Sequence, residues 1–99
     1  MQRVTVIVSD PWDFVTQAGS NVFVADVHRG GDGDEPLLLR LLEPVRWNGD
    51  DWHWFVATRT PGASFSLHGV TEPQATTDDW QNVPKAWRGR SPVARADVA

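Results

Sequence analysis

The 99-residue chain contains no cysteine, and this absence excludes disulfide bonds, thiolate nucleophiles and zinc sites built on thiolates. It also lacks an apolar run long enough to span a membrane, and Met1–Val6 carries no apolar stretch of signal-peptide length. We therefore expect a cytoplasmic protein with no membrane contact. The chain has no phosphate-cradling glycine loop and no dinucleotide fingerprint, so no cofactor is predicted.

Basic side chains are scarce over most of the chain. Residues 1–79 contain twelve acidic and five basic side chains, whereas residues 80–99 are net basic, and the whole chain carries a formal charge of −4. Binding to a nucleic-acid backbone needs a basic surface, which this composition does not supply. The charge therefore favours a protein partner, in particular a basic one, over nucleic acid.

Aromatic side chains are plentiful by contrast, with six Trp and four Phe. Each buried ring removes about 150–250 Å² from contact with water. The chain has the length of one domain, and these rings allow it to build a core in spite of its small size. Most of the aromatic residues are therefore expected to be structural.

The stretch Trp47–Phe55 holds half of the tryptophans and the clearest turn signal of the chain. Asn48-Gly49 favours two consecutive residues with φ > 0, as a type I′ hairpin turn requires. We predict a strand over Leu37–Trp47 that returns as Trp52–Arg59. Pro44 cannot donate to a strand ladder and therefore indicates a bulge or an edge, and a free edge offers a second copy of the chain a place to pair as a homodimer.

Further strands are predicted by alternation of apolar and polar residues in Arg3–Val8, Asn21–Arg29 and Ala63–Val70. Between the first two, Asp10 provides an N-cap and Gly19 a stop for a helix over Pro11–Ala18.

These elements predict a mainly β fold: a small five- to six-stranded antiparallel barrel or strongly bent sheet, in the manner of an SH3-like or OB-like meander, with one short helix near residues 11–18. Residues 1–90 are predicted to form this single domain, in which Val83–Trp87 adds an edge strand or clamp. Residues 91–99 are predicted to be a flexible C-terminal tail.

The turns predict which residues share a face of the sheet. A two-residue turn at Thr60-Pro61 or Pro61-Gly62 places Trp52 and Trp54 on one face with Phe65, and this face is the predicted core. The opposite face then groups Phe55 with arginines and histidines. Such a mixed face is either covered from within the chain, for example by Trp80, or it contacts a partner.

Aromatic and arginine side chains are enriched among the residues that dominate protein interfaces. The predicted partner-binding residues are Arg40, His53, Phe55, Arg59, His68, Asp50 and Asp51. No catalytic residue is predicted, because no nucleophile elbow surrounds the serines. No metal ligands are predicted either, since His53 and His68 supply two imidazoles where zinc takes at least three protein ligands.

The sequence thus favours a non-catalytic binding module, a small acidic adaptor, inhibitor or immunity-type domain. Two alternatives remain open. The first is a nucleic-acid-binding barrel in which Arg40, Arg46 and Arg59 line a groove. The second is a small-ligand pocket or an enzyme, such as an aromatic cage around a cation built from Trp47, Trp52 and an Asp.

Overall fold

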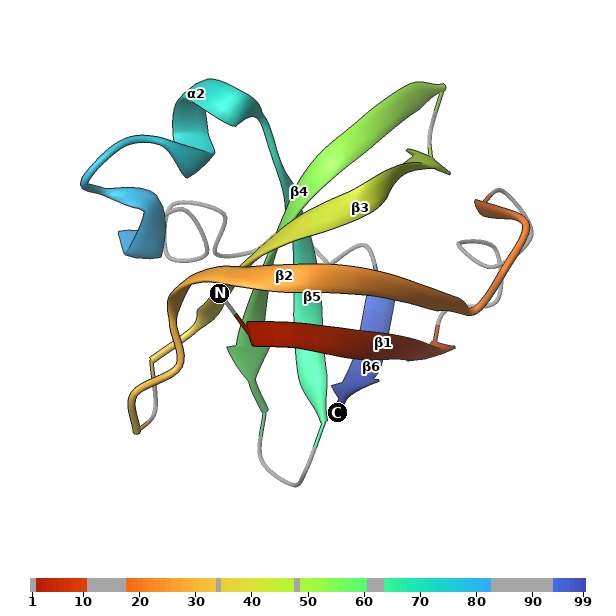
Figure 1. Ribbon diagram of the computed structural model, residues 1–99, viewed down its shortest axis with the longest axis horizontal. Helices are drawn as coiled ribbons and strands as arrows, with labels where there is room; N and C mark the ends of the chain where they lie inside the picture. The colour runs from red at the N-terminus through yellow and green to blue at the C-terminus, as the bar shows by residue number, and fades with distance from the viewer. Residues whose placement is uncertain (1, 11–17, 34, 48, 61–63, 83–93) are drawn as a thin grey trace.

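The computed structural model describes residues 2–10, 18–33, 35–47, 49–60, 64–82 and 94–99. Within these residues the chain forms a closed antiparallel barrel in which the strands follow one another around the wall in sequence order (Figure 1). A short helix and a 3-10 turn follow the fifth strand. The elements are β1 (Gln2–Asp10), β2 (Val22–Gly30), β3 (Leu37–Trp47), β4 (Asp50–Arg59), β5 (Phe65–Val70), α2 (Glu72–Ala75), η1 (Trp80–Asn82) and β6 (Ala94–Val98). The predicted small antiparallel barrel is confirmed.

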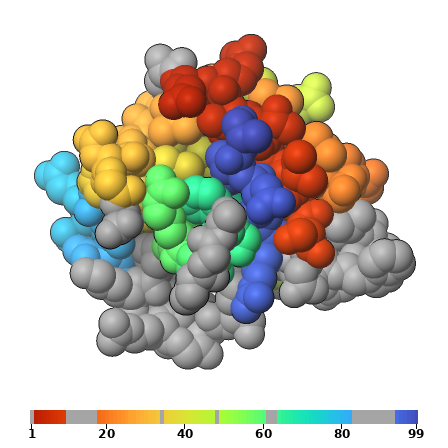
Figure 2. Space-filling model, turned by 90° about the horizontal axis from the view of Figure 1, so that it is seen from below, coloured from red at the N-terminus to blue at the C-terminus, as the bar shows by residue number. Residues whose placement is uncertain are grey.

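The last strand closes the barrel. β6 pairs antiparallel with both β1 and β5, and Figure 2 shows it lying in the wall between them. The prediction of a flexible tail over residues 91–99 is therefore wrong for Ala94–Val98. Ala94 and Ala96 face the core while Arg95 and Asp97 are exposed, so the segment does alternate. The alternation is hard to detect from sequence because alanine is only weakly apolar.

The interior of the barrel is filled by alternate residues of every strand. Phe55, Leu39 and Leu67 are completely buried in this cluster, and the rings of Phe23 and Phe55 lie 6.0 Å apart. At about 25 cal/mol per Å² of apolar surface, burial of such side chains is the main favourable term in folding. The buried members are Val4, Val6, Val8, Ala25, Leu37, Leu39, Leu41, Val45, Phe55, Ala57, Phe65, Leu67, Ala94 and Ala96.

A second buried cluster lies outside the barrel wall. It joins the outward-facing side chains of β3, β4 and β5 to α2 and η1, and its members are Leu38, Trp54, Val56, Val70, Ala75 and Trp80. Helix α2 begins at a capping box, in which the Thr71 side chain accepts from the backbone of Gln74 and the Gln74 side chain accepts from the backbone of Thr71. Trp80 thus covers the outer face of β3, β4 and β5, as one of the predicted alternatives had it, although the residues on that face differ from those predicted.

The predicted faces of β4 are wrong. Phe55 points into the barrel opposite Leu39, and Trp54 points outward opposite Arg40. Trp52 does pack against the barrel cluster as predicted.

Two register changes explain the error. Arg59 pairs with Phe65, so the β4–β5 connection contains five residues rather than two. The predicted bulge near Pro44 is present, but the pairing shifts by three residues between Arg40 and Val45. Each odd shift exchanges the two faces of a strand.

The β3–β4 hairpin forms as predicted. Trp47 pairs with Asp50, which leaves two residues in the turn, and Gly49 has φ +83°. The predicted helix over Pro11–Ala18 and the predicted edge strand over Val83–Trp87 fall on residues 11–17 and 83–93, outside the described part of the chain. The short helix α2 was not predicted from the sequence.

Candidate functional site

The predicted partner-binding residues do not gather on one surface. Phe55 is fully buried inside the barrel, whereas His68 lies on the outer side of β5 opposite Val56. The predicted pairing of Phe55 with His68 on one face is therefore wrong. His53 is three positions from the partner of His68 along β4, so the two histidines are not directly opposed either.

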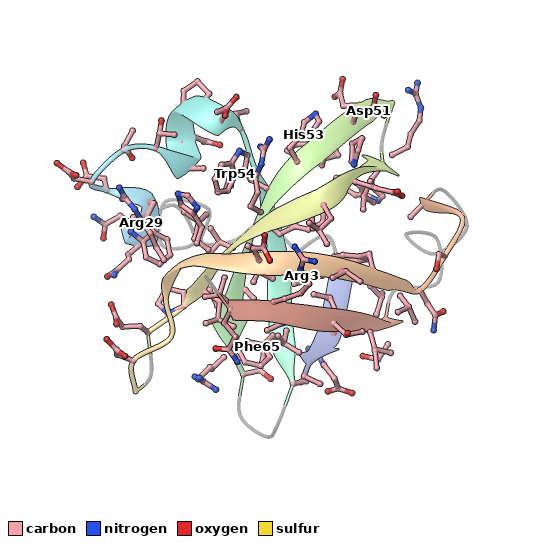
Figure 3. All side chains as sticks on the ribbon, in the orientation of Figure 1. Arg3, Arg29, Asp51, His53, Trp54 and Phe65 are labelled. Atoms are coloured by element: carbon pink, nitrogen blue, oxygen red, sulfur yellow. The ribbon has the colours of Figure 1, made fainter. Side chains whose placement is uncertain are left out.

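The remaining predicted residues lie at opposite ends of the barrel. Asp51 and His53 lie at the tip of the β3–β4 hairpin, far from Phe65 at the other end of the barrel (Figure 3). The Arg59 guanidinium stands 5.0 Å from the centre of the Phe65 ring.

The charged residues of the β3–β4 hairpin are exposed. Asp50 and His53 are open to solvent on β4, and Asp51 forms a 3.4 Å ion pair with Arg46. The guanidinium of Arg40 lies 4.9 Å from the Trp54 ring, on the outer face of the wall. These residues therefore form several small contacts rather than one binding surface.

Trp47 and Trp52 do not form an open aromatic cage. Their ring centres are 6.2 Å apart, and the Trp52 indole donates a 3.0 Å hydrogen bond to the Trp47 carbonyl oxygen. The Trp52 ring packs so closely on β5 that a Cβ atom at Gly69 would lie 2.8 Å from it. Both rings are partly buried and pack against the barrel cluster.

Burial on the outer side of β5 changes the pKa of the His68 imidazole. The imidazole is 9% exposed, its Nε2 lies 3.3 Å from the Thr58 hydroxyl, and burial lowers its pKa below the ordinary value. Loss of solvent disfavours the charged imidazolium and keeps this side chain neutral in the folded protein.

The buried imidazole predicts a loss of stability in acid. An unfolded chain takes up a proton at His68 at a higher pH than the folded chain does, so the unfolding free energy should fall as the pH drops below about 6.5. Denaturant unfolding between pH 7.5 and pH 5 measures this effect. The His68→Gln variant should show a smaller decrease over this range, and an identical decrease in the variant would contradict the assignment to His68.

A different feature of the surface forms a candidate site. Four large apolar side chains are exposed on the outer side of β1, β2 and β3: Ile7 at 40%, Val22 at 45%, Val24 at 37% and Leu42 at 47%. Ile7 pairs with Val22 across β1 and β2, and Val24 follows on the same face of β2. We call these four residues the apolar patch.

Three residues of the patch, Val22, Val24 and Leu42, line a hollow in the barrel wall. A cavity of about 340 Å³ is lined by Val22, Phe23, Val24, Leu42 and Glu43, and a second cavity of about 140 Å³ shares three of these residues and continues toward Pro44 and Val45. The pairing of β2 with β3 reaches only Ala25 and Leu41, just before the bulge. The wall therefore opens where the two strands separate, and Phe23 becomes part of the lining.

The charge at this hollow is negative. Glu43 is exposed at its edge, and no described residue forms an ion pair or a hydrogen bond with its carboxylate. Two basic side chains on the strands that carry the patch already form ion pairs. Arg3 on β1 pairs with Asp26 at 3.2 Å, and Arg46 on β3 pairs with Asp51. Within the described part of the chain, the hollow thus combines an apolar lining with one carboxylate that has no counter-ion.

Among the described residues, no group of three or more His, Asp or Glu side chains is placed to hold a metal ion. No helix in that part of the chain is long and apolar enough to cross a membrane. A scan against protein-family models, a search of curated proteins and a search of solved structures each found no match to this chain.

Sequence reasoning missed this site although a signal for it was present. Val22 and Val24 alternate with Phe23 and Ala25, so they occupy the outer face of β2, where polar residues are the norm for a solvated surface. Two valines at successive outward positions are therefore unusual. The hollow beside them was not predictable, because it depends on where β2 and β3 separate.

Proposed function

We propose that the protein is a non-catalytic protein-interaction module that binds its partner through the apolar patch. The observation that carries this proposal is the exposure of Val22, Val24 and Leu42 around a hollow of about 340 Å³, with Ile7 exposed beside Val22. Contiguous exposed apolar side chains with a polar border are typical of interaction sites, because leaving them in water costs free energy.

The chemistry of the hollow supports binding rather than catalysis. Among the described residues that line it, four are apolar and Glu43 alone is ionisable. General acid–base catalysis generally uses a positioned proton donor and acceptor near the reacting atoms. A single exposed carboxylate is better suited to recognising a charged group at the border of an apolar contact.

Replacement of Leu42 by Asp tests the proposal. The change places a charge in the patch and should weaken binding of a specific partner at least about tenfold, because burial of a leucine side chain contributes about 1.5–3 kcal/mol. Leu42 is 47% exposed, so the folded barrel should keep its stability to within about 0.5 kcal/mol. Affinity capture from an extract of the source cells, followed by measured affinities for the captured proteins, provides the readout.

Asn82→Asp is the matched control, since it adds the same charge at an exposed position on η1, which packs near Gly30, at the other end of β2 from Val22. Partners should bind this variant and the wild-type chain equally. Equal binding by the Leu42→Asp variant would reject the patch as the binding surface. Salt-sensitive binding of single-stranded oligonucleotides that Leu42→Asp leaves unchanged would instead favour the nucleic-acid alternative.

A further inference from the structure

We infer that the hollow accepts a cationic segment of a partner protein, in which a large apolar side chain enters the cavity and a neighbouring Lys or Arg reaches Glu43. This inference rests on the proposed function and specifies the chemistry of its partner. Three observations lead to it: the size of the hollow, the charges around it, and the charge of the whole chain.

The size of the hollow fits side chains rather than a large ligand. A closed apolar cavity of about 150 Å³ is known to hold one benzene molecule, so about 340 Å³ admits one or two large side chains. Pockets for drug-sized molecules range from about 300 to 1,000 Å³, which places this open hollow at the lower limit. A side chain presented by a protein segment suits these dimensions.

The charges favour a cation beside the apolar group. Glu43 lines the hollow and has no described counter-ion, whereas Arg3 and Arg46 are each paired with an aspartate. The Arg40 guanidinium is held over the Trp54 ring. An incoming Lys or Arg would therefore form a new ion pair at the border of the cavity without displacing an existing one.

The same charges disfavour two other occupants. An anionic partner would place its charge next to Glu43. A second copy of the chain would bring another Glu43 to the interface, and each copy carries a net charge of −4. Like charges brought together at an interface oppose association. A cationic partner is instead attracted by the negative net charge of the chain, and this attraction raises the rate of association.

Selection from a library of random 12-residue displayed peptides tests this inference. Peptides enriched on the immobilised wild-type chain should contain a Leu, Ile, Met or Phe within two residues of a Lys or Arg. The selected peptides are then synthesised, and their affinities for wild type, Leu42→Asp, Glu43→Gln and Glu43→Lys are measured by fluorescence polarisation at low and high salt.

We expect Leu42→Asp to weaken binding at least about tenfold, Glu43→Gln by about two- to fivefold and Glu43→Lys by about tenfold or more. Exchange of the peptide Lys or Arg for Glu should restore binding to Glu43→Lys. Asn82→Asp serves again as the control and should bind all peptides as wild type does.

The outcomes separate this inference from the proposed function. Peptides that lose affinity for Leu42→Asp but bind the Glu43 variants as tightly as wild type would overturn the cationic partner and leave the interaction surface standing. Peptides that bind Leu42→Asp as well as wild type would overturn both. Sedimentation that shows a wild-type dimer, dissociated by Leu42→Asp, would identify a second copy as the occupant and also overturn the inference.

Discussion

Replacement of Phe55 by Ala should lower the free energy of unfolding by about 3–5 kcal/mol, the usual cost of truncating a buried phenylalanine. Phe55 is 0% exposed, it pairs with Leu39 on β3 and Gly69 on β5, and its ring lies 6.0 Å from that of Phe23. Its removal leaves a cavity that the closed wall cannot readily collapse to fill. Denaturant unfolding followed by tryptophan fluorescence measures the loss, which is a large part of the stability of a domain of this size.

His53→Ala is the control for this experiment, because His53 lies on the same strand and is exposed. Its stability should stay within about 0.5 kcal/mol of wild type. A Phe55→Ala variant that keeps wild-type stability and loses partner binding would contradict the interior position of the ring. It would support the assignment of Phe55 to a binding surface, as the sequence alone indicated.

The barrel was predictable because its signals are local. Alternation in β1 marks Val4, Val6 and Val8 as inward residues, and these three are buried in the structure. The Asn48-Gly49 pair marked the β3–β4 hairpin, where Trp47 pairs with Asp50. Such patterns depend only on neighbouring residues, and antiparallel strands joined by short turns have few ways to pack.

The faces of β4 were not predictable because they depend on connections that the sequence specifies weakly. Pro44 indicated a bulge, but no residue indicated that the pairing would shift by three positions. The connection at Thr60 was predicted as a two-residue turn, but five residues separate Arg59 from Phe65. Since each odd change reverses the face, local alternation could not decide whether Trp54 or Phe55 enters the barrel.

The candidate site could not be predicted from the sequence for the same reason. Five of the seven predicted residues (Arg40, His53, Phe55, Arg59 and His68) were chosen because they were expected to share one face, and this grouping failed with the register of β4. The apolar patch instead depends on the end of the β2–β3 pairing at Ala25 and Leu41 and on the position of Glu43 beside the resulting hollow. Both are tertiary features, so the residue types alone could not reveal them.

The second large effect is expected at Gly30, where Gly30→Ala should lower the free energy of unfolding by about 2–5 kcal/mol. Gly30 has φ +83°, which costs an L-residue about 1–2 kcal/mol. A Cβ atom there would also overlap the Pro36 carbonyl oxygen and would lie 2.7 Å from the Trp80 ring. The carbonyl belongs to the backbone and Trp80 is buried, so neither can move freely, and overpacking of this kind adds about 1–3 kcal/mol.

Gly19→Ala separates the two contributions, because Gly19 has a similar φ of +80° and a Cβ atom there would meet nothing within 4 Å. This control should lose only the conformational cost of about 1–2 kcal/mol. The difference between the two losses of unfolding free energy then measures how tightly the β2–β3 connection packs against Trp80. Trp80 in turn holds η1 on the outer face of the barrel. Equal losses of stability in the two variants would show that this close contact does not constrain the fold.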